Sequence, residues 1–416
     1  MSLLTTLTRM WVTRSFKSFT FTKHYDTFLS YQECDQLGLY IHIPFCKQIC
    51  SFCPYCKVLY KEDVYQDYIE ALIKEIHMIG SQYPDKKEVT SLYFGGGTPA
   101  LADKDLKRIM EAVNSYFIIT QGIGLELHPD NVTIETLARL KEAGVTKISI
   151  GIQSFQSKFQ HILGRRNILD QAMKKALDTV SFETVSMDFI FALPHQTFDD
   201  LVNDIEKAFS IGANHIAIYP FIDFTFTKSN IPVMSKKEKR KLLDDITYYC
   251  KNKGYQRQSI WTFSKEKASY SSMTRDYFLG FGVSAATLLK DSFKINTFDI
   301  PSYIQRINKQ TIPTSLTMYF TKRQRMIYYL FWTLYSTEID SQSFEEIFNV
   351  PLKKVYGLEF YLAKKMNLLT KENNVYKMTL KGAFYYHYYE NFYTLSYIDK
   401  MWSILKEEPF PNHISL

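Results

Sequence analysis

Four cysteines lie close together in one short segment of the chain. Cys46, Cys50, Cys53 and Cys56 all fall within IHIPFCKQICSFCPYCK (residues 41–57), and the whole sequence has only two others. Disulfides, a zinc ion or an iron–sulfur cluster could each use such a group of thiols. Zinc sites with four cysteines usually combine two CxxC pairs that are a dozen or more residues apart. A CxxxCxxC triplet instead suits three corners of a cubane cluster, because thiolates favour iron–sulfur chemistry.

The spacing therefore favours the cluster, although it does not exclude zinc. Cys46, Cys50 and Cys53 would bind three irons, and the fourth iron would stay open for a reactant. Cys56 falls outside the triplet, as a structural thiol or as a relay for a radical or a methyl group. Six cysteines in 416 residues, four of them bunched, do not form the framework of a secreted disulfide protein. We therefore expect a reducing compartment and a cytoplasmic location.

Composition and charge exclude some function classes and leave others weakly supported. Hydrophobic residues at 46% and charged residues at 22% are typical of a globular protein. The net charge of +7 is mild for this length, and the one dense basic run is residues 236–241, so a nucleic-acid partner is not favoured. No apolar run approaches the ~20 residues that span a bilayer. Residues 1–25 contain no Asp or Glu; we favour an arm packed on its own domain over a mitochondrial transit peptide.

From Leu39 to Tyr219 the sequence alternates strand-like runs with amphipathic helical runs. This alternation predicts parallel strands joined by right-handed crossovers, in a doubly wound sheet or an incomplete (β/α)6 barrel. No GxGxxG follows the first strand, which disfavours a dinucleotide-binding sheet. The expected strands are Leu39–Ile43, Thr90–Phe94, Gly124–Leu127, Lys147–Gly151, Val185–Phe191 and His215–Tyr219, with helices near 62–80, 103–117, 133–143, 169–180 and 198–211.

Four of these strands, the first, third, fourth and fifth, each have one apolar face and one polar face. Successive side chains of a strand point to opposite sides, so the apolar face can pack under the helices. An unpartnered buried polar group costs about 1–3 kcal/mol, so we expect the polar interior to hold a polar ligand. The alternative is that one or two of these strands lie at an edge or face solvent. The side chains expected in the interior are Tyr40, His42, Glu126, Ser149, Gln153 and Asp188.

A separate module is expected from about Leu316 onward. Three helical runs and a hairpin about Asn373-Asn374 give the outline of a winged helix. Such modules often bind nucleic acid, but the Tyr-rich tail from Phe384 to Tyr397 is not notably basic. We therefore favour a role in packing against the first domain or in covering a substrate. The expected helices are residues 321–335, 341–348 and 351–365.

Six further motifs accompany the cysteine triplet. They are SLYFGGGTPALA, LELHPDNV, ISIGIQSF, LGRRN, MDFIFALPHQT and YFLGFGVSA, in this order. Together they resemble the radical S-adenosylmethionine (SAM) superfamily, and within it the subfamily of oxygen-independent coproporphyrinogen III oxidase and its relatives. The resemblance covers residues 39 to about 290. It implies an N-terminal arm (1–38), an incomplete (β/α)6 radical SAM barrel (39–300) and a mostly α, winged-helix-like C-terminal domain (301–416).

The resemblance also implies roles for particular residues. Cys46, Cys50 and Cys53 would hold a 4Fe–4S cluster whose open iron chelates SAM, and the subfamily's use of a second SAM implies two per chain. The candidates for a direct chemical role are Tyr40, Cys56 and Arg165. The glycine-rich stretch could also be only a tight turn, and Arg165 only a surface arginine. The positions that match SAM-binding residues are Tyr40, Phe52, Gly95, Gly96, Gly97, Thr98, Glu126, Gln153, Arg165, Asp188 and Ala286.

The implied activity is reductive cleavage of SAM to a 5′-deoxyadenosyl radical that abstracts hydrogen from an organic substrate. The substrate would be a tetrapyrrole, or a carbon centre methylated with a second SAM. The electron donor would be a protein such as flavodoxin or ferredoxin. The protein itself would be a monomer. At two places the sequence departs from the motifs of the subfamily, so the motifs do not assign one reaction. Pro54-Tyr55-Cys56 stands where the oxidase has Gly-Cys, and SYSSMTRDYFLGFG lacks the HN-x-x-YW motif of the haem chaperones. A non-catalytic haem-binding chaperone is the alternative function.

Overall fold

Six parallel strands form the centre of the protein. The computed structural model describes residues 3–24, 27–166, 170–227, 231–265 and 276–416. Within the sheet the six strands follow one another in chain order, and each neighbouring pair is parallel. The expected strands are confirmed, with every end within two residues of its expected position. They are β2 (Leu37–Ile43), β6 (Leu92–Gly96), β8 (Ile123–Leu127), β9 (Lys147–Gln153), β10 (Thr184–Phe191) and β11 (His215–Pro220).

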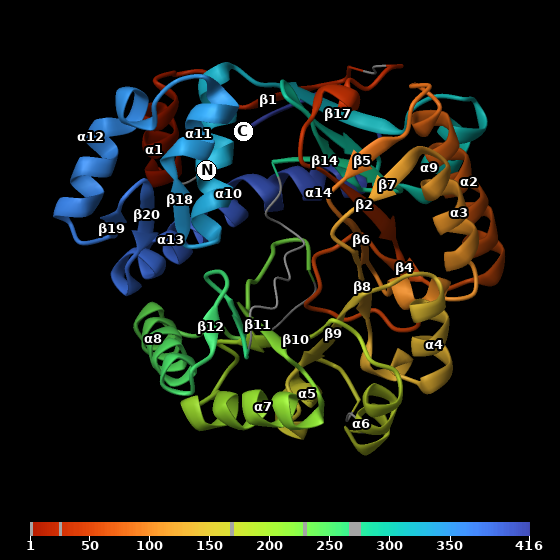
Figure 1. Ribbon diagram of the computed structural model, residues 1–416, viewed down its shortest axis with the longest axis horizontal. Helices are drawn as coiled ribbons and strands as arrows, with labels where there is room; N and C mark the ends of the chain where they lie inside the picture. Colours follow the sequence, from red (N-terminus) through yellow and green to blue (C-terminus); the bar gives the residue numbers. More distant parts are fainter. Residues whose placement is uncertain (1–2, 25–26, 167–169, 228–230, 266–275) are drawn as a thin grey trace.

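The expected crossover helices are confirmed as well. Figure 1 shows them on the outer side of the curved sheet, with neighbours along the chain packed side by side. Because the strand order never reverses, there is no switch point of the doubly wound kind, and the incomplete barrel is the observed arrangement. Among the described residues this sheet does not close on itself. The helices are α2 (Glu62–Gly80), α3 (Leu106–Tyr116), α4 (Ile134–Glu142), α6 (Asp170–Thr179) and α7 (Phe198–Ile211).

Eight further strands, which the sequence did not predict, extend the sheet beyond this half-barrel. β14 lies parallel to β2, and an antiparallel series continues from it to both ends of the chain. The first and last strands of the whole protein, β1 and β21, pair with each other. The domain boundaries at residues 38 and 300 stay a prediction. The added strands are β14 (Tyr277–Phe281), β15 (Ala286–Leu288), β16 (Ser292–Asn296), β17 (Thr314–Tyr319), β1 (Thr20–Thr22), β21 (His413–Ser415), β13 (Thr262–Ser264) and β12 (Gln256–Arg257).

A winged-helix unit follows the sheet, as expected. It has its own small core, in which Tyr329, Phe344 and Phe348 pack together, and a three-stranded sheet in the order β18-β20-β19. Two last helices then run back toward the barrel. The elements are α10 (Lys322–Tyr335), β18 (Glu338–Asp340), α11 (Ser341–Phe348), α12 (Leu352–Lys365), β19 (Leu369–Glu372), β20 (Val375–Met378), α13 (Leu380–Tyr393) and α14 (Asp399–Glu407).

Shorter elements complete the fold. Helix α8 ends before Gly254, whose φ of +79° favours glycine. No helix among the described residues has both the length and the apolar character to cross a bilayer. These elements are α1 (Leu3–Thr13), β3 (Phe45–Cys46), β4 (Val58–Leu59), β5 (Lys87–Val89), β7 (Phe117–Ile119), α5 (Ser157–Ile162), α8 (Lys236–Asn252) and α9 (Ile300–Asn308).

The buried carboxyl group of Glu75 connects helix α2 to three other segments of the fold. Glu75 of α2 is fully buried and accepts hydrogen bonds from the Gly282 amide at 2.7 Å, the Tyr303 hydroxyl at 2.6 Å and the Asn296 side chain at 3.2 Å. Burial raises the pKa of Glu75 from 4.5 to about 7, and the three donors offset part of that effect. Glu75 therefore links α2 to the turn after β14, to β16 and to α9.

We expect Glu75 to make the stability of the protein depend on pH. Its pKa is higher in the folded than in the unfolded chain, so the free energy of unfolding falls as pH rises from about 4.5 to 7, by about 3 kcal/mol for this group. Urea unfolding at pH 5 and pH 8 measures this difference in the free energy of unfolding, and Glu75→Gln should reduce it by a similar amount. Glu111→Gln, on an exposed face of α3, is the control. A Glu75→Gln protein with the wild-type slope would contradict this account.

Candidate functional site

The cysteine loop is a closed segment at the end of β2. β3 and β4 pair in parallel, Cys46 opposite Leu59, and so bring the two ends of the loop together. Cys46 is buried, whereas Cys50 and Cys53 are partly exposed. Burial raises the pKa of the Cys46 thiol to about 11 and also raises that of Cys53, which the nearby Lys57 ammonium lowers in part. The thiols of Cys46 and Cys53 therefore stay protonated until a positive charge, such as that of a metal, compensates for burial.

The three thiols fit a cluster better than a single ion. Cys50 and Cys53 lie near enough to Cys46 for each to raise its pKa. Yet among the described residues no three His, Cys, Asp or Glu side chains converge on a point where one metal ion could sit. A zinc ion needs such convergence, because all four of its ligands bind one atom. In a cubane cluster each thiolate binds its own iron, so neighbouring but separated thiols suit it.

Cys56 points away from the triplet. Its thiol donates to the carbonyl of Phe298 at 3.4 Å and is hydrogen-bonded to Ser284, and burial raises its pKa to about 11. Its own carbonyl accepts a hydrogen bond from His42 at 2.9 Å. The contacts place Cys56 in the packing between the cysteine loop and the segments after β14 and β16. The chemical role expected as one option for Cys56 stays a prediction.

The glycine turn Gly95–Thr98 packs directly on the cysteine loop. The Gly97 amide donates to the Ile43 carbonyl and the Thr98 amide to the Phe45 carbonyl, both at 2.8 Å. A Cβ on Gly97 would lie 2.8 Å from the Phe45 carbonyl oxygen, so no side chain fits there. The Thr98 hydroxyl approaches the Cys46 sulfur at 3.5 Å. The turn therefore holds the first cysteine in place.

The same turn also borders the inner face of the sheet, the side of the six strands opposite the helices. A Cβ on Gly95 would lie 2.9 Å from the Tyr40 ring and 3.3 Å from Glu126. Gly96 has a φ of +127°, and its amide donates to Glu126 at 3.2 Å. With the amides of residues 96–98 already engaged, the turn can serve a ligand by close backbone approach.

Tyr40 and His42 form a hydrogen-bonded chain that ends at the cysteine loop. The Cys56 carbonyl can only accept, so His42 Nε2 carries the proton and Nδ1 accepts from the Tyr40 hydroxyl at 3.0 Å. Burial lowers the pKa of His42 to about 4, so the ring is neutral at physiological pH. Tyr40 thus presents its ring and a fixed hydroxyl to the inner face.

Two carboxyls lie on the inner face, as the strand alternation predicted. Glu126 accepts from the Tyr93 hydroxyl at 2.9 Å, and both oxygens of Asp188 accept from Ser149, at 2.9 and 2.8 Å. Burial raises the pKa of Glu126 to about 7, with a further rise from Asp188, and burial raises that of Asp188 to about 6. Both acids are therefore poised to change protonation when a ligand binds beside them.

Arg165 reaches the same region from the segment that follows helix α5. Its guanidinium donates to the Gly151 carbonyl and lies over the Phe52 ring, 5.6 Å from the centroid. Its buried Nε finds no acceptor among the described residues. Gln153, at the end of β9, has a φ of +69°, and its amide lies beside Gly151. Arg165 is thus half-buried and keeps an unused donor, of the kind that can pair with a carboxylate, and its role stays a prediction.

A pocket connects Arg165 with the cysteine loop. Its lining includes Cys50 of the loop, His128 after β8, and both Arg165 and Arg166. Burial, together with the nearby Arg165 guanidinium, lowers the pKa of His128 to about 4. The sequence predicted no role in the site for His128, although it lies on the same motif as Glu126. Ala286, the remaining expected contact, opens β15 two residues after Ser284, whose hydroxyl lies 3.5 Å from His42 Nε2.

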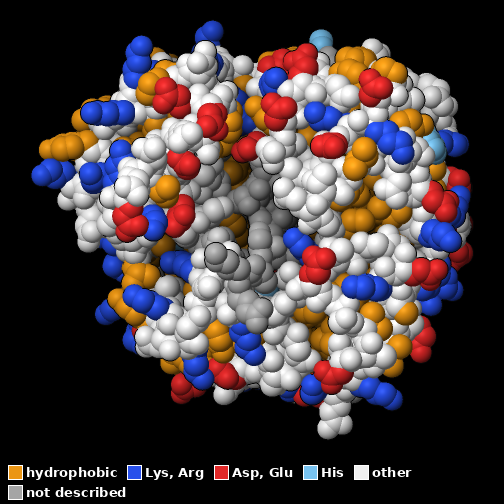
Figure 2. Space-filling model, in the orientation of Figure 1, with side chains coloured by type: hydrophobic (Ala, Val, Ile, Leu, Met, Phe, Trp, Pro, Cys, Tyr) orange, Lys and Arg blue, Asp and Glu red, His pale blue; other side chains and the backbone are white. Residues whose placement is uncertain are grey.

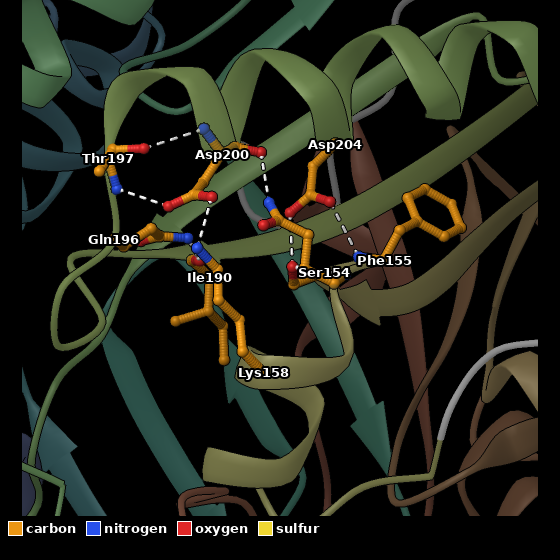
Figure 3. A network of polar contacts seen from close by, with 9 residues as sticks. Ser154, Phe155, Lys158, Ile190, Gln196, Thr197, Asp200 and Asp204 are labelled. Atoms are coloured by element: carbon orange, nitrogen blue, oxygen red, sulfur yellow. Dashed lines mark hydrogen bonds and ion pairs between the residues drawn. The ribbon is translucent and has the colours of Figure 1, made fainter.

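Figure 3 shows what fixes the loop after β9. The Ser154 hydroxyl and the Phe155 amide donate to Asp204 of α7 at 2.6 and 2.9 Å. Asp200, one turn earlier, closes a capping box with Thr197 and accepts from Lys158 at 2.7 Å. The motifs ISIGIQSF and MDFIFALPHQT thus meet through the first two turns of α7, and this contact holds Gln153 and the segment leading to Arg165.

The C-terminal helix α14 touches the other side of the cysteine loop, a contact that the sequence did not reveal. Lys406 donates to the Pro54 carbonyl at 2.9 Å, and the Trp402 ring lies 6.0 Å from that of Tyr55. Asp399 fastens the start of α14 by accepting from the Thr225 amide and hydroxyl at 2.8 and 2.6 Å. The loop is thus held between the barrel and the last helix.

Comparison with known proteins identifies the kind of domain that contains this site. Residues 40–208, from Tyr40 to the middle of α7, match the model of the radical SAM superfamily. The chain contains a radical SAM domain. Such a domain implies a 4Fe–4S cluster and SAM, the groups that the three thiols and the polar inner face suit.

Two kinds of known protein are similar to this chain over most of its length or about two thirds of it. Over 359 residues it is 26% identical to the haem chaperone HemW of Bacillus subtilis, covering 81% of this chain and 94% of that one. Over 306 residues it is 24% identical to the oxygen-independent coproporphyrinogen III oxidase of Escherichia coli, covering 66% of each chain. The Escherichia coli oxidase HemN matches in structure with a TM-score of 0.75 at 20% identity, over 88% of this chain and 93% of that chain, which shows the shared fold.

We predict that three of the four cysteines in the loop are needed to hold iron. Protein reconstituted anaerobically should bind about four irons and four sulfides, and alanine at Cys46, Cys50 or Cys53 should abolish this. Cys56→Ala, the matched control in the same loop, should retain both the iron and the absorption spectrum, because its thiol bonds to Phe298 and Ser284. Loss of iron in Cys56→Ala as complete as in the other three would refute the assignment.

Proposed function

We propose that this protein is a radical SAM enzyme that holds a 4Fe–4S cluster on Cys46, Cys50 and Cys53 and cleaves SAM reductively. One observation supports this most strongly: the three-thiol loop is hydrogen-bonded to the glycine turn that borders Tyr40 and Glu126. When bound, the cluster would supply the electron that splits SAM into methionine and a 5′-deoxyadenosyl radical that takes hydrogen from the substrate. The chain itself binds, orients and keeps water away.

Each polar group of the inner face has a proposed part in binding. Glu126 and Asp188 would accept hydrogen bonds from ribose hydroxyls, and the Ser149 hydroxyl keeps Asp188 in position. Arg165 would pair with a carboxylate through its unused Nε–H. Phe52, under the guanidinium, supplies an apolar wall. Tyr40, fixed by His42, would pack against SAM beside the glycine turn.

For the substrate we propose a tetrapyrrole, or another biosynthetic intermediate with a carbon centre that is oxidised or methylated with a second SAM. Similarity to coproporphyrinogen oxidases supports the tetrapyrrole. A non-catalytic haem chaperone is the second candidate, favoured by the similarity to HemW over most of both chains. We further propose an electron donor such as flavodoxin or ferredoxin, and a cytoplasmic location, which the six free cysteines support.

Turnover of SAM separates the two candidates. With dithionite and coproporphyrinogen III under anaerobic conditions, we expect the enzyme to form 5′-deoxyadenosine together with a mass change of the tetrapyrrole. Asp188→Asn should reduce the rate without loss of iron, because Asp188 lies on β10, outside the cysteine loop. Stoichiometric binding of haem, with no 5′-deoxyadenosine formed from SAM, would favour the chaperone instead.

We also propose two SAM molecules per chain, only one of them on the cluster. One SAM has a single ribose and a single carboxylate, whereas Glu126, Gln153, Arg165 and Asp188 spread over three successive strand–helix units. Equilibrium dialysis of the anaerobic holoprotein should therefore saturate near two SAM per chain and fall toward one in Arg165→Ala. Arg240→Ala, on the exposed side of α8, should still bind two. Saturation at one in the wild type, with and without substrate, would show that Arg165 serves a substrate acid.

A further inference from the structure

Three large apolar side chains of helix α1 are exposed to solvent. Leu3, Leu7 and Trp11, spaced four residues apart, are 74%, 53% and 53% exposed. Arg9 and Thr13, on the opposite side of the helix, are buried, and the Arg9 guanidinium donates to the Lys17 carbonyl. A helix that served only its own protein would show the reverse pattern, with its apolar stripe inward. The outward stripe therefore indicates a further contact.

Helix α12 of the winged-helix unit has a second outward apolar face. Leu358, Tyr361, Leu362 and Met366 are 53%, 57%, 44% and 54% exposed, while Phe360 faces the unit's core. In helix-turn-helix proteins the second helix of the pair enters the major groove of DNA. Leucine, tyrosine and methionine in a row do not suit phosphates or base edges, which need donors and acceptors. This face is suited to an apolar medium.

The two helices form one surface, which we call the α1–α12 face. Arg14, at the end of α1, forms an ion pair with Glu359, and the Tyr356 hydroxyl donates to the Val12 carbonyl at 3.4 Å. The Arg14 guanidinium also lies 4.8 Å from the centroid of the Trp11 ring. Figure 1 shows α1 beside α12 at the edge of the molecule.

Exposed basic residues outnumber acidic ones around the α1–α12 face. Helix α1 has no acidic residue, and the single acid of α12, Glu359, is already paired with Arg14. Neighbouring α11 adds two acids, Glu345 and Glu346, so the basic character belongs to α12 and to the residues that follow α1. Figure 2 shows apolar side chains flanked by basic ones along the edge formed by α12. The exposed basic residues are Arg14, Lys17, Lys353, Lys354, Lys364 and Lys365.

We propose that the α1–α12 face binds an anionic lipid surface. Leucine side chains would enter the headgroup boundary, Trp11 and Tyr361 would lie at the interface, and the lysines would meet lipid phosphates. A second copy of the chain or a protein partner would cover the apolar side chains, but a second copy would bring a second set of lysines against the first. Since no described helix can cross a bilayer, the protein would lie on the surface. The proposal stands independently of the cluster and of SAM.

Vesicle flotation of the full chain tests this proposal. Binding is expected to phosphatidylcholine vesicles that contain phosphatidylglycerol, to drop sharply in 0.5 M NaCl, and to be weak with phosphatidylcholine alone. Leu7→Ser with Trp11→Ser, and separately Tyr361→Ser with Leu362→Ser, should each lower binding at least about fivefold. Tyr248→Ser is the matched control, because Tyr248 of α8 is 52% exposed and lies outside this face.

Three results would overturn the proposal, provided that circular dichroism shows folded variants. The first is equal binding to neutral and anionic vesicles, which indicates unspecific adhesion. The second is anionic binding that the α1 and α12 variants leave unchanged, which places the lipid contact elsewhere. The third is no vesicle binding together with a dimer in gel filtration that Trp11→Ser dissociates, which assigns the face to a second copy.

Discussion

The close approach of two backbone segments, the glycine turn after β6 and the start of the cysteine loop after β2, governs the arrangement of the site. The Gly97 and Thr98 amides bond to the Ile43 and Phe45 carbonyls, and a Cβ at Gly97 would collide with that segment. β2 and β6 are neighbouring parallel strands, so their carboxyl ends meet at one edge of the sheet. Cys46 therefore has its position set by the sheet itself, while Cys50 and Cys53 follow on the loop. A side chain larger than hydrogen in the turn would move the first ligand.

The polar side chains of the inner face form hydrogen bonds within the protein, which stabilise this face without a ligand. These hydrogen bonds do not satisfy every polar group, so the face is also suited to a ligand. His42 is neutral and bonded on both ring nitrogens, and Asp188 has two hydrogen bonds from Ser149. Yet burial keeps the pKa of Asp188 near 6 and that of Glu126 near 7, so neither is fully stabilised as an anion. Donors on a bound ligand would complete the hydrogen bonding. The site thus combines order in the free protein with carboxyl groups that can still accept hydrogen bonds.

The parts of the fold and of the site that could be predicted from the sequence are those encoded within one short segment. The central strands and the polar residues on them follow from a period of two within single segments, and the glycine turn is visible as three consecutive glycines. The strand extension from β14 to β21 left no such signal, because short antiparallel strands such as Ala286–Leu288 depend on partners distant in the chain. His128 was missed because its place in the site comes from Cys50 and Arg165, which lie on other segments of the chain. The spacing of the cysteines showed only that Cys56 follows the triplet. It could not show the direction in which the Cys56 side chain points.

The most distant of these contacts gives the cysteine loop a second support. Helix α14, near the end of the chain, meets the loop through Lys406 and Trp402, and its start is tied to the barrel through Asp399. The chain then ends in β21, which pairs with β1 and so joins the sheet that contains β2. The loop is therefore held on one side by the glycine turn and on the other by a helix anchored at both ends. The two supports come from residues 95–98 and 399–407, so the position of the cysteine loop depends on two segments that are far apart in the sequence.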